Sequence, residues 1–327
     1  MKLWEKNENS RNWNTFIQSV GDDNPMAYQE WQGILQKSYD LKTYFFYNED
    51  EKKNIQAVCP TYLSKFQIYP TLYSLAGGIV AKNLEQAEFL ITDIKNFCAK
   101  KKIDSLLLSA YEQYCFAGME QNKKSEVFFQ IKKTKEETWN SLRDKSRNLI
   151  RKAKKEGFRI EKNKKNLADF YNIYFRFIRS KKNIPHSLRF FKTLLETFQN
   201  SAELITASSN NVIVGGILVI FGAKKAIYPF QAATLKAKKA SCTQLLIWEA
   251  VKSCLNREIE SLSMGESSIN SPVFKSKINF GGLSKDIYQY KKGSLPAQGL
   301  ARSTYIRFPA ILQRPLTSLA KVAGKVI

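Results

Sequence analysis

Residues 204–264 read LITASSNNVIVGGILVIFGAKKAIYPFQAATLKAKKASCTQLLIWEAVKSCLNREIESLSM. Apolar runs separated by short polar turns predict three strands, an amphipathic helix and a last strand, in that order. The expected bounds are 204–208, 212–221, 226–232, 243–255 and 261–264. Strands and helices mixed in this way predict an α/β fold.

The same order of elements occurs about 160 residues earlier in the chain. The strands and helix of this first copy are expected at 44–47, 55–63, 71–75, 84–101 and 105–109. Helical spacing of apolar residues also predicts helices before each copy, at 13–20, 27–39, 167–178 and 188–198. Such internal symmetry indicates two related domains in one chain.

The expected domains are 1–131 and 132–299, followed by a basic tail at 300–327. The second domain begins with the most basic stretch of the chain, 132–165, which holds 14 basic and 5 acidic residues. A helix is expected within this stretch, ending at Gly157. The tail has spaced apolar residues, so we expect it to pack on the first domain or to lie on a membrane surface.

The charge of the chain is its most unusual bulk property. Lys and Arg number 52 against 29 Asp and Glu, a net charge of +23, while 43% of the residues are apolar. The apolar content predicts packed, globular domains. The positive field favours polyanionic partners, namely nucleic acid, an anionic membrane surface or a phosphate-bearing co-substrate. A solvated lysine surface without such a partner is the alternative.

The five cysteines include no CxxC pair, which argues against a structural zinc site, and no metal is expected. Their wide spacing and odd number favour a reducing compartment. Residues 1–10 lack the apolar core of a signal peptide. The longest apolar stretch, 212–222, is too short to span a bilayer. We therefore expect a cytoplasmic protein, with peripheral contact at the inner face of the membrane as a further expectation.

Four segments resemble the FemAB-like, or CelD/BioF-like, branch of the GNAT acyltransferase superfamily. They are SLAGGIVA at 74–81, SRNLIRKAKKEG at 146–157, Met264-Gly265 with the polar loop after it, and KINFGG at 277–282. Their order and spacing are similar to the family over nearly the whole chain. The resemblance implies two tandem GNAT-like domains, each a mixed twisted sheet flanked by helices. It also implies an enzyme of the acyltransferase class.

By this resemblance the chain moves an acyl group from a CoA-like or other activated donor to an amine, in cell-envelope or polysaccharide biosynthesis. The implied acceptor is a small-molecule or lipid-linked amine, and no tightly bound cofactor is implied beyond the acyl-CoA or aminoacyl-tRNA donor. One alternative is an aminoacyl-tRNA-dependent transferase that acts on a peptidoglycan precursor, with tRNA as partner. Another is a basic RNA- or membrane-binding protein on a degenerate GNAT scaffold.

The sequence departs from the family at three places. Ser276 stands where an aromatic residue is usual, and no heptad segment could form the long helical arm of tRNA-using members. The glycine-rich pyrophosphate loop of ordinary GNAT proteins is replaced by the basic segment 235–243. The missing arm favours an acyl-CoA donor over an aminoacyl-tRNA donor.

Acyl transfer to an amine requires a neutral amine, close approach of the two reactants and stabilisation of an oxyanion. Lys277, expected on a loop before the last strand, is the first catalytic candidate, because its ammonium could hold developing negative charge or a phosphate. Glu266 is the candidate general base. The alternatives are a surface lysine and a loop-capping carboxylate. The only histidine, His186, would be needed for a Ser–His–Asp or Cys–His arrangement, but an ordinary loop histidine is favoured.

A donor site is expected where a helix begins after a lysine-rich turn, because free backbone N–H groups, the helix dipole and lysines together bind anions. The residues are Lys236, Lys238, Lys239, Ser241 and Thr243. On the preceding strand, Tyr228 and Gln231 are expected to line the acyl channel. Arg147 and Arg151 lie four apart on one helical face and are expected to bind a substrate diphosphate. The alternatives are a solvated basic turn for the lysines, core packing for Tyr228, and a solvated helix face shared with Asp144 for the two arginines.

Overall fold

The computed structural model describes residues 2–4, 10–20, 23–64 and 70–293. The chain forms two compact units. The first comprises Met1–Lys124 and the chain from Asp286 onward, and the second comprises Ser125–Lys285. The predicted domain bounds, 1–131 and 132–299, stay a prediction. The predicted tail at 300–327 lies outside the described residues.

The sheet of the first unit has the strand order β1-β2-β3-β4-β6-β13, with β5 paired to β3. Neighbouring strands are antiparallel except β4 and β6, which are parallel because α3 crosses between them. The strands are β1 (Lys2–Trp4), β2 (Lys42–Glu49), β3 (Ile55–Ser64), β4 (Thr71–Ser74), β5 (Val80–Ala81), β6 (Ser105–Ala110) and β13 (Leu283–Lys292).

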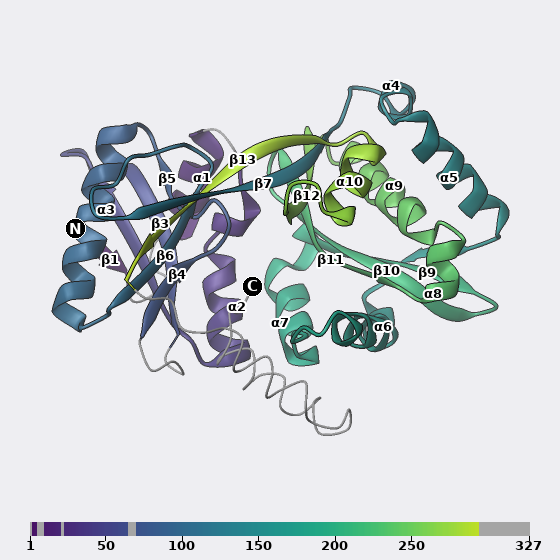
Figure 1. Cartoon of the computed structure of the whole chain (residues 1–327), viewed down its shortest axis with the longest axis horizontal. Helices are drawn as coiled ribbons and strands as arrows, with labels where there is room; N and C mark the ends of the chain where they lie inside the picture. Colours follow the sequence, from purple (N-terminus) through teal and green to yellow (C-terminus); the bar gives the residue numbers. More distant parts are fainter. Residues whose placement is uncertain (1, 5–9, 21–22, 65–69, 294–327) are drawn as a thin grey trace. The chain divides into compact units, whose positions relative to one another are not determined.

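Helices cover both faces of this sheet (Figure 1). On one face Phe97 of α3 meets Tyr44 and Phe46 edge-on, at centroid distances of 5.0 Å each. On the other face Trp13 of α1 meets Phe45, the residue between those two on β2, at 5.3 Å. The alternation along β2 therefore divides the core between the two faces. The helices are α1 (Ser10–Ser19), α2 (Glu30–Tyr39) and α3 (Leu84–Lys101), with a 3₁₀ turn at Pro25–Ala27.

The sheet of the second unit has the order β7-β12-β11-β10-β9-β8. Again one neighbouring pair, β11 and β12, is parallel and the others are antiparallel. The strands are β7 (Glu120–Gln130), β8 (Arg159–Lys162), β9 (Ala202–Ser209), β10 (Val212–Phe221), β11 (Lys225–Ala233) and β12 (Ser261–Ser267).

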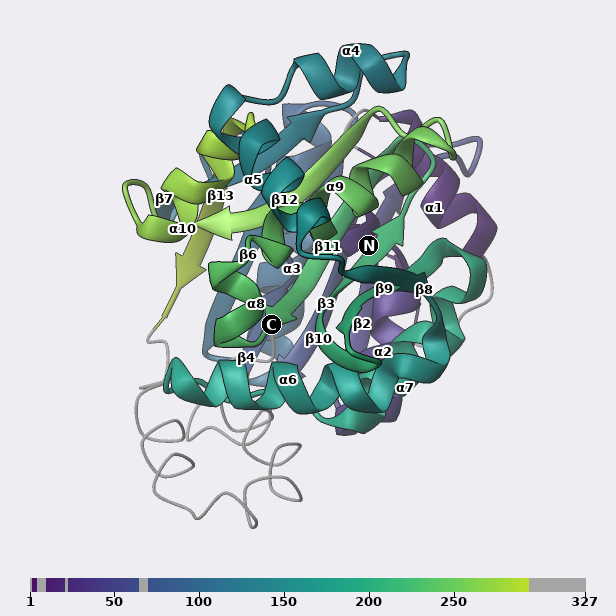
Figure 2. The same cartoon turned by 90° about the vertical axis from the view of Figure 1, so that its right-hand side faces the viewer.

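In this second sheet, α9 packs on β9, β10 and β11 together with α5, while α6 and α7 cover the opposite face (Figure 2). The core below α9 is built from apolar strand residues and from Trp248, which meets Trp139 edge-on at 4.9 Å. The helices are α4 (Lys135–Asn140), α5 (Asp144–Lys155), α6 (Leu167–Ser180), α7 (Leu188–Phe198), α8 (Leu235–Lys239), α9 (Cys242–Leu255) and α10 (Pro272–Phe280), with 3₁₀ turns at Lys164–Asn166 and Gln199–Ser201.

The predicted duplication is confirmed. In each unit two antiparallel pairs are followed by a helix and then by a strand parallel to the third strand of the copy. The α/β class and the mixed, helix-flanked sheets are confirmed with it. One local expectation is wrong: Lys277 is not on a loop. Ser271 caps a helix by accepting the Phe274 N–H at 3.1 Å, Pro272 occupies its first turn, and Gly281, with φ +114°, ends it.

Candidate active site

The second sheet opens between its two parallel strands. β11 and β12 pair only over Lys225–Ile227 and Ser261–Ser263. Beyond Ile227, β11 continues to Ala233 paired with β10 on its other side, and β12 continues to Ser267 paired with β7. Within the described residues, the two facing edges beyond this point are not paired with each other. The facing backbone groups of β11 and β12 beyond this point therefore form no ladder hydrogen bonds with each other, and we call this unpaired stretch between the two strands the slot.

A β-bulge shapes the β12 side of this slot. Between Ser263 and Glu266 the strand has one residue more than its partner β7 has between Phe128 and Glu126. Gly265 lies in the bulge with φ +77°, a conformation that residues with a Cβ rarely adopt. The bulge turns the Gly265 and Glu266 carbonyls toward α10.

Lys277, on α10, binds this bulge with its ammonium group. Its Nζ donates to the Gly265 carbonyl at 2.8 Å, to the Ser267 hydroxyl at 2.7 Å and to the Glu266 carbonyl at 3.3 Å. The structure thus brings two predicted catalytic residues, Lys277 and Glu266, together. Burial lowers the pKa of Lys277 to about 8, although the nearby Glu126 and Glu266 carboxylates act in the opposite direction.

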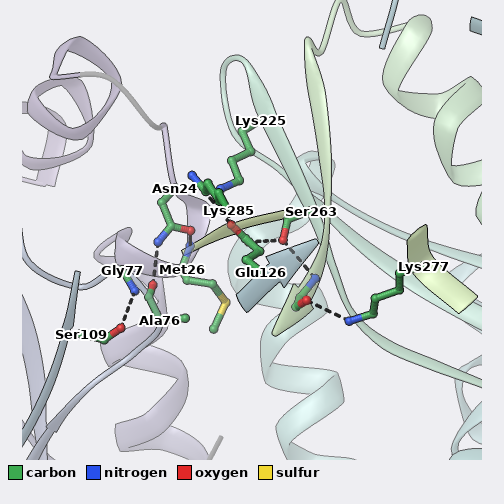
Figure 3. A network of polar contacts seen from close by, with 11 residues as sticks. Asn24, Met26, Ala76, Gly77, Ser109, Glu126, Lys225, Ser263, Lys277 and Lys285 are labelled. Atoms are coloured by element: carbon green, nitrogen blue, oxygen red, sulfur yellow. Dashed lines mark hydrogen bonds and ion pairs between the residues drawn. The ribbon is translucent and has the colours of Figure 1, made fainter. Parts of the chain in front are cut away.

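Glu126, on β7, is the buried acidic centre next to the bulge (Figure 3). Its carboxylate accepts the Ser263 hydroxyl proton and lies 3.3 Å from the Lys225 Nζ and 3.8 Å from the Lys285 Nζ. The side chains of Glu126 and Lys225 are each only 4% exposed, so each requires the other's charge. The Ser263 hydroxyl also accepts the Gly265 N–H at 3.1 Å. Glu126 is therefore linked to the bulge through one hydroxyl.

Sequence reasoning did not single out Glu126, Ser263, Lys225 or Lys285. One acidic residue beside the apolar run 127–129 is a possible signal, because a charged side chain in a buried strand needs partners. Ser263 resembles any small residue of a strand. The cluster forms through pairing between β7, β11, β12 and β13, which lie far apart in the sequence.

The corresponding place in the first unit is closed. There β4 and β6 pair from Thr71 to Tyr73, and the chain then crosses to β6 instead of leaving a slot. The Gly77 N–H donates to the Ser109 hydroxyl at 3.2 Å, and the Ile79 N–H donates to the Ser109 carbonyl at 2.8 Å. A Cβ on Gly77 would lie 2.3 Å from the Tyr111 ring, so glycine is needed for the crossing. The described part of the first unit therefore has no equivalent slot between its parallel strands.

The predicted donor residues lie where β11 leads into α9. Lys236, Lys238 and Lys239 are on the short helix α8, and Ser241, with φ +61°, precedes the first turn of α9, which contains Thr243. Lys238 is half-buried, with its Nζ 3.6 Å from the centroid of Phe177. Burial, with Lys181 nearby, lowers the pKa of Lys238.

The other predicted binding residues have local partners. Tyr228 is buried in the core below α9, and burial raises its pKa. Gln231 is half-buried and donates to the Thr243 carbonyl at 3.0 Å. On α5, Arg147 donates to the Asn140 and Leu142 carbonyls at 2.9 and 3.0 Å and pairs with Asp144. Arg151 donates to Asn148 at 3.0 Å and lies over the Trp139 ring. Their roles in binding remain predictions.

Two reactive side chains of the second unit are packed as core. The His186 ring stacks on Phe190 at a centroid distance of 4.1 Å and meets Phe230 edge-on at 5.3 Å. Burial raises the pKa of the Cys242 thiol to about 12, which disfavours the nucleophilic thiolate. In the ranges described, no helix has the length and apolarity needed to cross a bilayer. The same ranges hold no cluster of three potential metal-ligating side chains.

Comparison with known proteins gives one match in sequence and several similar folds. Residues 140–276 match the family model of the acetyltransferase (GNAT) domain. A search of curated proteins gave no significant match. Among solved structures, FemX is 12% identical with a TM-score of 0.67, covering 88% of this chain and 97% of its own.

Two further structures are similar. The C-terminal domain of a putative lysylphosphatidylglycerol synthetase from Agrobacterium fabrum is 12% identical with a TM-score of 0.57, covering 88% of this chain and 93% of that domain. A tandem GNAT protein from the clavulanic acid biosynthesis pathway is 8% identical with a TM-score of 0.50, covering 85% and 97%. At these identities the likeness concerns the fold. Residues 140–276 are thus similar to a GNAT acetyltransferase domain, and the fold of the chain is similar to the folds of FemX and of a tandem GNAT protein.

Proposed function

We propose that the chain is an N-acyltransferase that moves an acyl group from a CoA thioester to an amine. The observation that carries this proposal is the slot between β11 and β12. Its two edges are not paired with each other, and the pantetheine arm of CoA is an extended chain with two amides that could bond to them as an added strand would. The match of residues 140–276 to an acetyltransferase domain supports the same assignment.

In the proposed reaction the amine nitrogen bonds to the acyl carbon and the carbon–sulfur bond breaks. The proton lost by the amine passes to the thiolate of CoA, with Glu266 as the proposed general base. The Lys277 ammonium is the proposed partner of the oxyanion. Because its hydrogens already bind Gly265, Glu266 and Ser267, the oxyanion would replace one of these bonds, most simply that to the Ser267 hydroxyl.

The donor's phosphates are assigned to α8 and the start of α9. Lys236 and Lys239 are exposed there, and α9 provides 14 residues of helix behind its first free N–H groups. Arg147, Arg151, Tyr228 and Gln231 stay assigned to substrate binding. The proposed acceptor is a small-molecule or lipid-linked amine of the cell envelope, reached at the inner face of the membrane. The likeness to the putative lysylphosphatidylglycerol synthetase domain supports this acceptor class.

Calorimetric titration of the purified chain with CoA and acetyl-CoA tests the donor. Saturable binding of both, followed by release of free thiol when acetyl-CoA and a panel of amines are added, is the expected result. No heat and no thermal stabilisation at millimolar CoA would contradict a CoA donor.

An aminoacyl-tRNA donor is the second candidate. The shared fold with FemX and the basic side of α5 favour it, since Lys152 reaches the Lys239 carbonyl at 3.4 Å and so extends the basic surface of α8. Binding of tRNA with a steep dependence on salt, without binding of CoA, would select this candidate.

A further inference from the structure

We propose that Ser263 and Glu126 are positioning residues for the acyl-transfer site: they fix the β12 bulge, and the bulge in turn fixes the Lys277 ammonium. This inference rests on the proposed function for its catalytic meaning. Its structural content stands on the contacts of the second unit alone (Figure 3).

The first step is the direction of the Ser263 hydroxyl. A serine hydroxyl has one proton, and here the proton is donated to the Glu126 carboxylate. The oxygen lone pairs are then available to the Gly265 N–H, which lies at 3.1 Å. Since an ionised carboxylate can accept hydrogen bonds but not donate them, Glu126 selects a single orientation of this hydroxyl.

The second step is the anchoring of Glu126 itself. Lys225 from β11 and Lys285 from β13 lie 3.3 and 3.8 Å from the same carboxylate oxygen, and the carboxylate is almost wholly buried. Charges held in this way inside a protein are screened little by solvent. Residues from three strands, β7, β11 and β13, therefore hold the Glu126 carboxylate in place beside the bulge. The negative charge of Glu126 also acts on Lys277.

The third step is the peptide unit of Gly265. Its N–H is held by Ser263 and its carbonyl by Lys277 at 2.8 Å. Gly265 has no side chain with which to resist rotation, and a Cβ at this position would have only the Lys277 Nζ within 4 Å. The two hydrogen bonds therefore set the orientation of the bulge. The groups around the Lys277 ammonium are Glu126 on β7 and Glu266 on β12, with Lys225 and Lys285 beside Glu126.

Competitive acetylation of lysines, read by mass spectrometry across pH, tests the inference on the full chain without a known substrate. The midpoint of Lys277 labelling reports its ionisation, and Lys275, exposed on the same helix, is the internal reference. In Ser263→Ala the released bulge should admit water to Lys277, so its midpoint should rise by at least half a pH unit. Ser263→Thr, which keeps the hydroxyl, should restore the wild-type midpoint.

Two further variants keep the test specific. Ser261→Ala removes a hydroxyl two residues away on the same strand and should leave the Lys277 midpoint unchanged. Gly265→Ala strains the bulge directly and should move the midpoint as Ser263→Ala does. An unchanged midpoint in Ser263→Ala and Gly265→Ala, an equal shift in Ser261→Ala, or no recovery in Ser263→Thr would each overturn the inference.

Activity then separates the inference from the proposed function. If the chain transfers acyl groups, Ser263→Ala should lower kcat at least tenfold with little change in KM for the donor, while Ser261→Ala stays at wild-type rate. A labelling shift without any acyltransferase activity would refute the proposed function and leave the positioning network intact. Activity in wild type with no fall in kcat in Ser263→Ala would refute the positioning role alone.

Discussion

Lys277 is half-buried and donates three hydrogen bonds to one bulge, and these contacts predict the effect of removing its side chain. We expect Lys277→Ala to lower kcat by roughly 10²–10³, the usual cost of losing one donor to an oxyanion. The fold should persist, because the side chain contacts the bulge and not a core cluster. Turnover and melting temperature measured together check this. A folded variant that retains near-wild-type turnover would exclude Lys277 from the site.

The lowered pKa of Lys277 predicts a pH dependence. Only its ammonium form can stabilise an oxyanion, and that form is lost as the pH rises through about 8. We therefore expect kcat to fall above pH 8 in the wild type. Lys277→Arg, which stays charged, should lack this fall even if its rate is lower. Measurement of kcat from pH 6 to 10 in both proteins tests this prediction. If kcat still falls above pH 8 in Lys277→Arg, the fall is caused by the titration of another group.

At the scale of elements, α8 and the start of α9 are expected to bind the donor's phosphates. Lys238→Glu with Lys239→Glu should weaken CoA binding at least tenfold, about 1.4 kcal/mol, and added salt should mimic the loss. The matched control is Lys132→Glu with Lys133→Glu, the same charge change at exposed residues that follow β7. Equal weakening in both pairs would indicate a general field effect and not a site.

The helix α2 and the residue before it hold two buried amides that the described residues do not satisfy. All four side-chain polar atoms of Gln29 and Gln32 lack a hydrogen-bond partner there. Replacing such a group by an apolar one of similar shape removes a desolvation cost of about 1–3 kcal/mol. Gln32→Met should therefore raise the free energy of unfolding in urea. Gln36→Met, which loses a 2.7 Å hydrogen bond to Thr43, should not. A loss of stability in Gln32→Met would reveal a polar partner.

The elements also show how far the sequence could be read. Periodicity located 188–198 and 212–221 to the residue, because α7 and β10 have uninterrupted apolar patterns. It missed α10, where Ser271 and Pro272 start a helix too short for a clear period. The bulge at Gly265 and the ion cluster at Glu126 depend on register between distant strands. No local sequence pattern carries that information, so the bulge and the ion cluster could be identified only from the three-dimensional structure.

For the molecule as a whole, we expect only one of the two duplicated units to bind a donor. The slot of the second unit is open between β11 and β12, whereas the chain at Gly77–Ile79 closes the corresponding place in the first unit. We therefore expect one donor to bind per chain. Titration calorimetry of CoA against a known protein concentration checks this, and a stoichiometry of two would show that the first unit also binds. Gly77→Ala should disturb the first unit locally without changing donor affinity.

The connection of the two units has a consequence for synthesis on the ribosome. The first unit needs β13, whose residues Tyr288–Lys292 pair with β6 and whose Tyr290 hydroxyl accepts the Tyr114 N–H at 2.6 Å. The whole second unit, Ser125–Lys285, is translated before that strand segment. At about 5–20 residues per second, the 161 residues between 125 and 285 delay it by roughly 8–32 s. The second unit can thus complete its fold while the first unit still lacks β13, and until then the edge of β6 is unpaired and exposed to pairing with other nascent chains.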